Sequence, residues 1–353
     1  MFENVKLEKG MYNLSGKSFS EYLEENDPAE NYTGTPYEGL DAFERQLKRF
    51  DIRIGGECCD RVEKFFTTTE SAVLFPEFVR RSIKKGFEDC CLDDMVAAKT
   101  LCESNHYSGC VMAENTYEKA TEGEVMAASI IKENSAVITL KKYGRLVNSS
   151  YEAVRQQRLD LFAVMLRGIG KKLADTLVAD AVSILKTNTT QISSKTTVLD
   201  YSDITALYGA MGDFNMNTII VSPANAAKIL AMQQLMESSS REQGKIYLPF
   251  GAKMITSSKI DDYSILGFDR DFTLEFVAST DVVLETDKLI DRQLDHIGIS
   301  ICAGFKKIFN EAVKMSPVGD LSKTPQSSLT ACQLPFQGSL RKRLFKFQKN
   351  THL

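Results

Sequence analysis

Apolar side chains recur at helical spacing in two stretches of the first 90 residues. In LDAFERQLKRF, one helical face carries Leu40, Phe43, Leu47 and Phe50. In TTTESAVLFPEFVRRSIKKGFED, a second face carries Phe75, Phe78 or Val79, and Ile83, and Gly86 is the expected stop. A short helix is also predicted over 18–25, ended by Asp27-Pro28. The surrounding residues 1–40 are polar, and we expect them to be loosely held.

The pattern changes to a β-type pattern between Cys90 and Val147, where Val, Ile, Thr and Tyr are frequent. These residues, interrupted by SNHYSG and EKATEGE, predict a long two-stranded ribbon with a polar tip near Glu122-Gly123. Because such a ribbon is marginal in water, it needs a surface outside itself. Its last strand, AVITLKKYGRLV, leads directly into a helical pattern, and a capping box is predicted at Ser149 and Glu152.

One long helix is predicted from Ser150 to Lys186, with a length of roughly 55 Å. Its continuous apolar stripe consists of Phe162, Met165, Ile169, Leu173, Leu177, Ala181 and Ile184. Further apolar surface comes from Leu159, Leu161, Val164 and Leu166. A helix that is apolar nearly all round must be covered from more than one side. Gly168 and Gly170 are unfavourable in a helix interior, so we expect a bend or a close backbone contact there.

After a polar linker over 187–201, shorter elements follow. The patterns predict a helix over 202–211, a buried strand over 217–222, and a second helix with Ser222 as N-cap and Pro223 at its first position. Further strands are predicted in AKMITS, YSILGFD, FTLEFVAS and VVLET, and HIGISICAGFKKIFNEAVKM carries an alternation that returns to the core. The composition then changes abruptly, and residues 317–353 are predicted to be an unstructured tail.

Composition excludes several classes of protein. The chain has 353 residues, 43% hydrophobic and 25% charged, without an apolar run of membrane-spanning length or a secretory signal, so we expect synthesis in a cytosol. Eight cysteines, including the pairs Cys58-Cys59 and Cys90-Cys91, are too sparse for a disulfide framework and are expected to be reduced. The net charge is -4, and because the tail carries +5 the body carries -9. An acidic body argues against a sequence-reading DNA binder.

The strongest metal candidate is CESNHYSGC. Its possible ligands are Cys102, His106 and Cys110, with Cys90 and Cys91 upstream. Zinc sites generally use tighter CxxC spacing, so ordinary thiols are favoured. In the second candidate, GDFNMNT, the calcium-type positions are Asp213, Asn215 and Asn217. Thr218 and Ala224 stand where a calcium loop has glycine and glutamate, so a polar turn is the better interpretation.

Catalytic signatures are also weak. Asp269, Asp271 and Glu275 could form paired carboxylates, but a solvated charged turn is favoured. Only three histidines are present, His106, His296 and His352, without a GxSxG or HExxH motif, and GIGKK lacks a third glycine for a phosphate-binding loop. We therefore assign no catalytic, cofactor-binding or metal-binding residue. The tail segment LRKRLFKFQK could dock on nucleic acid or an anionic membrane, although a disordered basic tail is the simpler interpretation.

The order of these elements resembles the major capsid proteins of tailed double-stranded DNA bacteriophages, which have the Hong Kong 97-like capsid fold. The resemblance covers roughly residues 36–315. It is carried by LDAFERQLKRFDIRI, TTTESAVLFPEFVRRSIKKG, ITLKKYGRLVNSSYEAVRQQRLDLF, NTIIVSPANAAKIL, and ILGFDRDFTLEF through VVLETDKLIDRQLDHIGISICAGFKKIFNEAVK.

The resemblance implies an α+β fold in six parts. They are an N-terminal arm over 1–89, an extended β-loop over 90–147, a peripheral domain with a spine helix over 148–201, an axial domain over 202–271, return strands of the peripheral domain over 272–316, and the basic tail over 317–353. Some relatives cross-link lysine to asparagine. Lys141, Lys142 and Asn310 are present here, but no motif assigns them to this reaction.

The function implied by the resemblance is that of a structural subunit and not of an enzyme. Such a subunit assembles into hexamers and pentamers that enclose double-stranded DNA without sequence-specific binding, and it uses no cofactor. The expected partners are further copies, a separate scaffolding protein, a portal and a maturation protease. The expected location is the virion, after assembly in the host bacterial cytoplasm.

Two alternatives remain open. An encapsulin-like nanocompartment shell shares this fold and would enclose a protein cargo. A thiol- or metal-dependent enzyme would instead use the cysteines and His106 of the candidate metal site.

Overall fold

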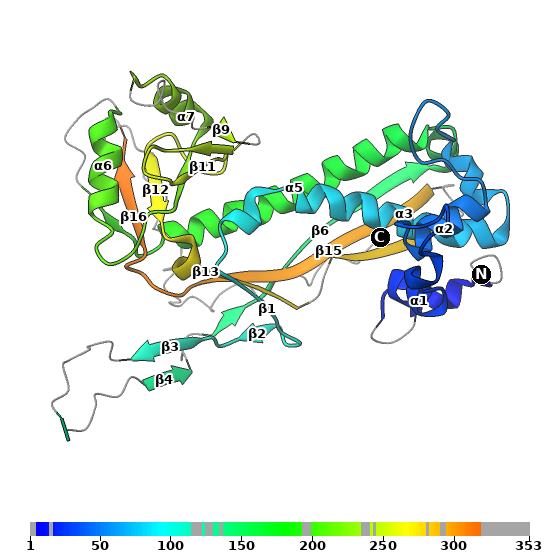
Figure 1. The fold of residues 1–353 in the computed structure, drawn as a ribbon, viewed down its shortest axis with the longest axis horizontal. Helices are drawn as coiled ribbons and strands as arrows, with labels where there is room; N and C mark the ends of the chain where they lie inside the picture. The colour runs from blue at the N-terminus through cyan, green and yellow to red at the C-terminus, as the bar shows by residue number, and fades with distance from the viewer. Residues whose placement is uncertain are drawn as a thin grey trace, which may run out of the picture. The chain divides into compact units, whose positions relative to one another are not determined.

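The computed structural model describes residues 5–13, 17–113, 122–123, 130–133, 137–192, 199–233, 241–242, 245–279, 282–289 and 294–318. Helices, two mixed sheets and two short antiparallel strand pairs make up this part of the chain, so the predicted α+β class is confirmed. Figure 1 shows the long helix α5 (Leu159–Lys186) beside the long strand β15 (Leu294–Lys307), and the two elements are in contact.

The N-terminal helices begin where the sequence provides caps. They are α1 (Phe19–Asn26), α2 (Ala42–Arg49) and α3 (Thr69–Glu88), and their capping boxes begin at Ser18, Asp41 and Thr68. Four 3₁₀ turns accompany them: η2 (Lys9–Asn13), η3 (Ala29–Tyr32), η4 (Val62–Phe66) and η5 (Cys91–Asp94). The expectation that residues 1–40 are loosely held is wrong for the described residues, because Leu7, Phe19, Leu23 and Tyr32 are buried.

Helices α3 and α5 approach each other closely. The prediction that α3 stops at Gly86 is wrong, because the helix continues to Glu88. Gly86 instead allows the contact: a Cβ at this position would overlap the carbonyl oxygen of Arg167. At Gly170 a Cβ would overlap the carbonyl oxygen of Ile83, so the predicted close contact at this glycine is confirmed. Gly168 has no neighbour within 4 Å of an added Cβ.

The predicted continuous helix from Ser150 is interrupted. A short helix α4 (Tyr151–Arg155) comes first, and α5 begins only at Leu159, so α5 has 28 residues and a length of about 42 Å. The backbone between α4 and α5 forms hydrogen bonds with an earlier segment of the chain. The carbonyl of Gln157 accepts from Val62 N, and Leu159 N donates to the carbonyl of Asp60. The cap is also shifted by one residue, because Ser150 and not Ser149 accepts from the backbone N–H of Ala153.

The first sheet contains β1 (Ala98–Leu101), β6 (Lys141–Ser150), β13 (Leu274–Ala278), β14 (Val283–Leu289) and β15. Strand β15 is central, with β6 antiparallel on one side and β14 and β13 on the other. Its inward residues are Ile297, Ile299, Ile301, Ala303 and Phe305, and they belong to the same core as α3 and α5. The sheet pairs β6 only with β15, so the other edge of β6 is unpaired within the described residues.

The second sheet has the order β7 (Thr190–Gln191), β16 (Val313–Pro317), β12 (Ser264–Phe268), β8 (Thr218–Val221), β11 (Lys253–Thr256), β10 (Lys245–Tyr247) and β9 (Arg241–Glu242). Helices α6 (Tyr201–Gly209) and α7 (Pro223–Leu230) contribute to its separate core. Ser222 caps α7 and Pro223 is its first residue, as predicted. Strand β7 lies in the segment that was predicted to be a linker. Strand β16 was predicted to belong with the return strands of the peripheral domain, but it pairs with β12 of the second sheet.

The ribbon predicted between Cys90 and Val147 is present as two short antiparallel pairs. Strand β2 (His106–Tyr107) pairs with β5 (Ile138–Thr139), and β3 (Cys110–Ala113) pairs with β4 (Ile130–Glu133). Gly123 has a positive φ of 90°, in agreement with a turn at the predicted tip. The predicted tail lies outside the described residues except for Pro317 and Val318.

Candidate functional site

One face of α5 is apolar and uncovered. The exposed fractions of Leu161, Val164 and Met165 are 53%, 59% and 47%. Of the stripe predicted from the sequence, Phe162, Leu177 and Ala181 are buried, whereas Ile169, Leu173 and Ile184 are only partly buried. The buried face is centred instead on Leu166, Gly170, Ala174 and Leu177, because α3 and the first sheet contact α5 there. An exposed apolar face of this kind is a common feature of protein contact surfaces.

A groove of about 700 Å³ lies between α5 and the edge strand β6. Its apolar lining includes Tyr143, Leu146, Val147, Ile169 and Leu173. Its charged lining consists of Lys142, Arg145 and Lys172, without any acidic residue. None of these three cations forms an ion pair with another described residue. The groove is therefore apolar in its lining and positively charged.

The groove has a defined wall because β6 is bonded to α5. The hydroxyl of Tyr143 donates to the carboxylate of Asp180, and Lys141 Nζ lies 3.2 Å from the same carboxylate. Burial and the hydrogen bond to Asp180 raise the pKa of Tyr143, which keeps the phenol protonated as a donor. These contacts fix the separation of the strand and the helix at one end of the groove.

A cluster of three phenylalanines forms a second unusual surface. Phe214, Phe272 and Phe309 come from three separate segments, and their ring centroids are 5.7, 5.9 and 6.2 Å apart. Phe272 is 48% exposed, and the other two rings are partly buried. The same segments carry the exposed acids Asp213, Asp271 and Glu311. We call this surface the aromatic cluster; it is apolar in its centre and bears acidic side chains close to it in sequence.

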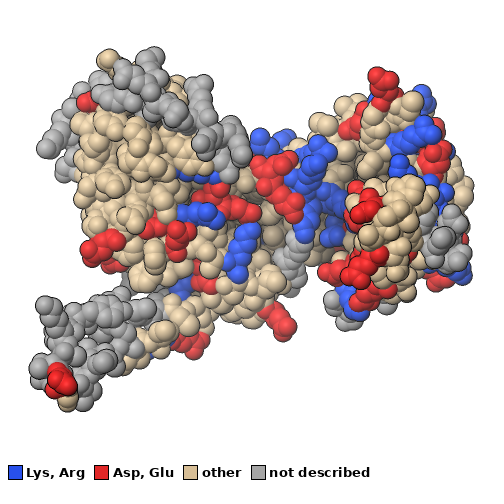
Figure 2. All heavy atoms as spheres, in the orientation of Figure 1, with Lys and Arg blue, Asp and Glu red and all other residues tan. Residues whose placement is uncertain are grey.

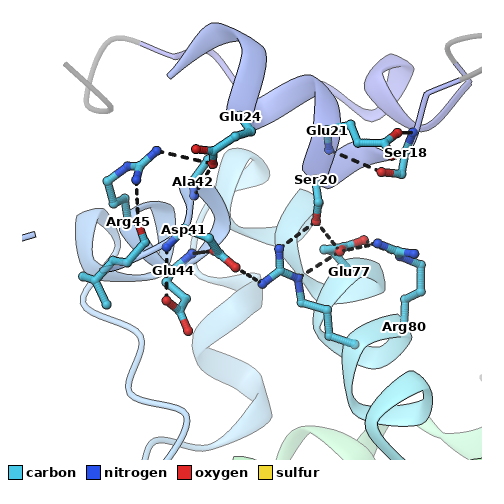
Figure 3. Close-up of polar contacts among 12 residues, drawn as sticks. Ser18, Ser20, Glu21, Glu24, Asp41, Ala42, Glu44, Arg45, Glu77 and Arg80 are labelled. Carbon is cyan, nitrogen blue, oxygen red and sulfur yellow. Dashed lines mark hydrogen bonds and ion pairs between the residues drawn. The ribbon is translucent and has the colours of Figure 1, made fainter. Parts of the chain in front are cut away.

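A polar network joins α1 to α3 (Figure 3). The carboxylate of Glu77, which is fully buried, accepts from Ser20 Oγ at 2.6 Å, Arg80 Nε at 2.8 Å and Arg81 Nε at 3.0 Å. Burial opposes ionisation of this carboxyl, but the bonds from Arg80, Ser20 and Arg81 outweigh it and hold the pKa of Glu77 below its ordinary value. Arg81 also donates to Asp41, so the N-terminal helices are tied to α3 at several points.

A second buried ion pair closes this region. The Arg45 side chain is fully buried, and its Nε donates to Asp27 Oδ2 at 2.7 Å. Arg45 Nη1 donates to the carbonyl of Leu40, and the guanidinium lies 4.4 Å from the centre of the Tyr32 ring. The α1–α2 segment is therefore packed through buried apolar residues, and its buried charges Arg45 and Asp27 are paired with each other.

The C-terminal end of α5 is capped by a lysine from β15. Lys307 Nζ donates to the carbonyls of Leu185 and Thr187 at 3.0 and 2.6 Å and to Thr189 Oγ1 at 2.8 Å. Burial lowers the pKa of Lys307 to about 8. A cation at a helix C-terminus satisfies carbonyls that have no partner within the helix. The cap joins the end of α5 to the first sheet.

The structure disperses the candidate metal ligands. Cys102 Sγ lies 3.7 Å from the carbonyl oxygen of His106, and Cys110 is exposed. Cys90 and Cys91 pack against the first core, and a hydrogen bond from Cys91 lowers the pKa of Cys90 to about 7. Across the described residues, no group of three or more His, Cys, Asp or Glu side chains could hold a metal ion. The side chain of His296 and all of His352 lie outside the described residues.

Two of the three calcium-type residues, Asn215 and Asn217, contact the candidate carboxylates Asp269 and Asp271. Asp269, which is buried, accepts from Asn215 N at 3.0 Å and Asn217 Nδ2 at 2.9 Å and caps α9 (Arg270–Thr273). These donors already satisfy the carboxylate. Glu275 lies apart from this group and accepts from Thr100 and Tyr107 at 2.6 Å each. The arrangement locks a turn and attaches Tyr107 to the first sheet.

Acidic and basic residues are nearly equal in number in the chain, and both kinds are visible on its surface (Figure 2). Figure 2 shows basic and acidic side chains mixed on the face in view, without a large region that is basic alone among the drawn residues. In the portion of the chain that the structure describes, no helix combines the length and the apolar character required for a membrane crossing. The features that remain as candidate functional surfaces are the uncovered face of α5, the groove and the aromatic cluster.

The comparison with protein families gives a match over part of the chain. Residues 133–297 match the family described as Phage capsid protein. The match runs from the end of β4 through β6, α5 and most of the second sheet into β15. The resemblance to phage capsid proteins predicted from the sequence is therefore confirmed.

Solved structures of shell proteins are also similar. The virus-like particle from Pyrococcus furiosus has 13% identity and a TM-score of 0.47, and the alignment covers 68% of this chain and 98% of that one. The capsid of cyanophage P-SCSP1u has 13% identity and a TM-score of 0.47, and the alignment covers 64% of this chain and 87% of that one. The holo-SrpI encapsulin complex from Synechococcus elongatus PCC 7942 has 11% identity and a TM-score of 0.47, and the alignment covers 64% of this chain and 85% of that one. No match is found among curated protein sequences.

Proposed function

We propose that the chain is a structural subunit of an icosahedral phage capsid with the Hong Kong 97-like fold. Copies assemble into hexamers and pentamers and enclose a double-stranded DNA genome. The observation that carries the proposal is the match of residues 133–297 to phage capsid proteins. The chain acts by assembly and has no catalytic role.

The uncovered apolar face of α5 supports this proposal. Leu161, Val164 and Met165 would remain in water in an isolated subunit, and covering them by a neighbour is favourable by roughly 25 cal/mol per Å² of apolar area. The unpaired edge of β6 offers backbone groups for a further contact. Several modest contacts of this kind, closed into rings, give a shell a stability that no single contact supplies.

The charge of the chain suits a container for DNA. The body of the chain is acidic, and acidic groups repel phosphates, so packaged DNA would not adhere to the wall. A separate scaffolding protein, a portal and a maturation protease are the further partners in this account. The assembled protein would be found in virions, after assembly in the host bacterial cytoplasm.

Electron microscopy of the purified protein, with analysis of the particle contents, tests the proposal. Uniform closed shells or capsomer rings are the expected result, and particles isolated from an infected or induced host should contain double-stranded DNA. Shells that contain a single protein cargo and no DNA would favour an encapsulin-like compartment over a phage capsid. A small oligomer under all conditions, with scaffold supplied, would contradict both and favour an enzyme.

A further inference from the structure

We propose that the aromatic cluster of one copy docks in the groove of a neighbouring copy. The groove is the one between β6 and α5, and the cluster is Phe214, Phe272 and Phe309. The inference rests on the proposed function, because it names a contact through which the copies of a shell would associate.

The two surfaces are complementary in charge. Lys142, Arg145 and Lys172 line the groove, and no acidic residue lines it. The segments of the aromatic cluster carry three exposed acids, Asp213, Asp271 and Glu311. None of the six groups forms an ion pair with another described residue. Opposite charges arranged in this way select a partner and its orientation.

The two surfaces are also complementary in polarity. The groove exposes Leu146, 56% accessible, beside the partly buried Ile169 and Leu173. The cluster presents Phe272 at 48% exposure, supported by two rings that limit its movement. A rigid aromatic side chain that enters an apolar pocket is the usual centre of a strong protein contact.

In the proposed contact the aromatic cluster belongs to another molecule. None of the three phenylalanines lines the groove of its own chain. The two surfaces are different, so the contact is heterologous: each copy uses its groove toward one neighbour and its aromatic cluster toward another. Repetition of such a contact closes rings when the rotation permits, which is what a capsomer requires.

Charge reversal tests the contact. The groove variant Arg145→Glu with Lys172→Glu and the cluster variant Asp213→Lys with Glu311→Lys each change only exposed side chains, so both should fold. We expect each to raise the subunit concentration required for assembly by roughly tenfold or more, because attraction becomes repulsion at two pairs. All four substitutions in one chain should recover most of the loss. Controls are Lys171→Glu, next to the groove on α5 but outside its lining, and Glu57→Lys, and both should assemble as the unmodified protein does.

A mixing experiment tests the polarity of the contact. The groove variant retains a native aromatic cluster, and the cluster variant retains a native groove. The two altered surfaces are also opposite in charge, so an equimolar mixture should assemble at a lower total concentration than either variant alone, as followed by sedimentation velocity. Normal assembly of both variants, or absence of rescue in the fourfold variant, would overturn the inference and leave the shell proposal intact.

The experiments distinguish failure of the proposed shell function from failure of the proposed contact. If the unmodified chain forms no shells or rings, the proposed function fails, and the same variants then test pairwise self-association by sedimentation. Weaker association of both variants, with rescue in the fourfold variant, would still support the contact. An unmodified chain without any self-association would overturn both.

Discussion

Gly86 of α3 and Gly170 of α5 each face the backbone of the other helix. A Cβ on Gly86 would overlap the carbonyl of Arg167, and a Cβ on Gly170 would overlap the carbonyl of Ile83. The two contacts run in opposite order along the helices, so α3 and α5 are antiparallel where they meet. The glycines let the backbones touch, and this contact joins the N-terminal helices to the long helix.

Gly170→Ala tests this contact. The added methyl group meets backbone atoms that cannot rotate away, so we expect the free energy of unfolding to fall by about 3 kcal/mol. Gly168→Ala is the matched control two residues away, where an added Cβ meets nothing within 4 Å. This change should stabilise the unassembled subunit by roughly 0.5 to 1 kcal/mol. Urea unfolding measures both values, and equal effects of the two substitutions would contradict the close approach.

The cap on α5 gives a second prediction. Lys307→Met keeps the apolar stem but removes the donor to the carbonyls of Leu185 and Thr187. We expect a loss of about 1 to 2 kcal/mol at pH 7, because both carbonyls then lose a side-chain donor. Lys171→Met, at an exposed position of the same helix, should change the unfolding free energy by less than about 0.5 kcal/mol. A thermal unfolding midpoint that is the same for both variants would argue against the cap.

The buried carboxylate of Glu77 should make stability depend on pH. Its pKa in the folded chain lies below the ordinary value of 4.5, because Arg80, Ser20 and Arg81 favour the ionised form despite burial. Its contribution is therefore fully present above about pH 4.5 and is lost as the pH falls through the folded pKa. Denaturant unfolding between pH 3 and 7 should show this loss.

Glu77→Gln removes the charge but keeps the shape. We expect a loss of roughly 2 to 4 kcal/mol at pH 7, because Arg80 and Arg81 lose their shared partner. The difference from the unmodified chain should shrink as the pH falls below 4.5. A difference that is independent of pH would show that ionised Glu77 is not the stabilising form.

Opposite faces of α5 should respond differently to a charge. Leu177 is fully buried, so Leu177→Asp should cost several kcal/mol and abolish the folded subunit. Val164→Asp places the same charge at a position that is 59% exposed and should leave the subunit folded. Circular dichroism and solubility distinguish the two outcomes. Leu173→Asp, at a partly buried position, should be intermediate.

Local signals predicted much of the fold. The cap at Ser222 depends on a side chain within three residues of the helix start, so sequence alone is sufficient to place it. The spacing of Phe43 and Leu47 identified the buried face of α2. The order of the elements also carried the resemblance that the family match to residues 133–297 confirms.

Long-range contacts decided what the sequence could not predict. The break before Leu159 depends on hydrogen bonds to Asp60 and Val62, which lie about a hundred residues earlier. Because α5 is apolar on most sides, periodicity could not distinguish the face of Met165 from that of Leu166. The aromatic cluster was missed because Phe214, Phe272 and Phe309 meet only in the folded chain. The division into arm, loop, peripheral and axial parts stays a prediction.

The mass of the assembled particle tests the central claim most directly. One chain has a mass of 39.4 kDa, and a mass measurement on purified protein, made above and below the concentration at which particles appear, counts the copies. We predict a single narrow population at the multiple of 39.4 kDa that an icosahedral shell requires. A mass that stays at one or two copies at every concentration, with scaffold present, would contradict a shell subunit.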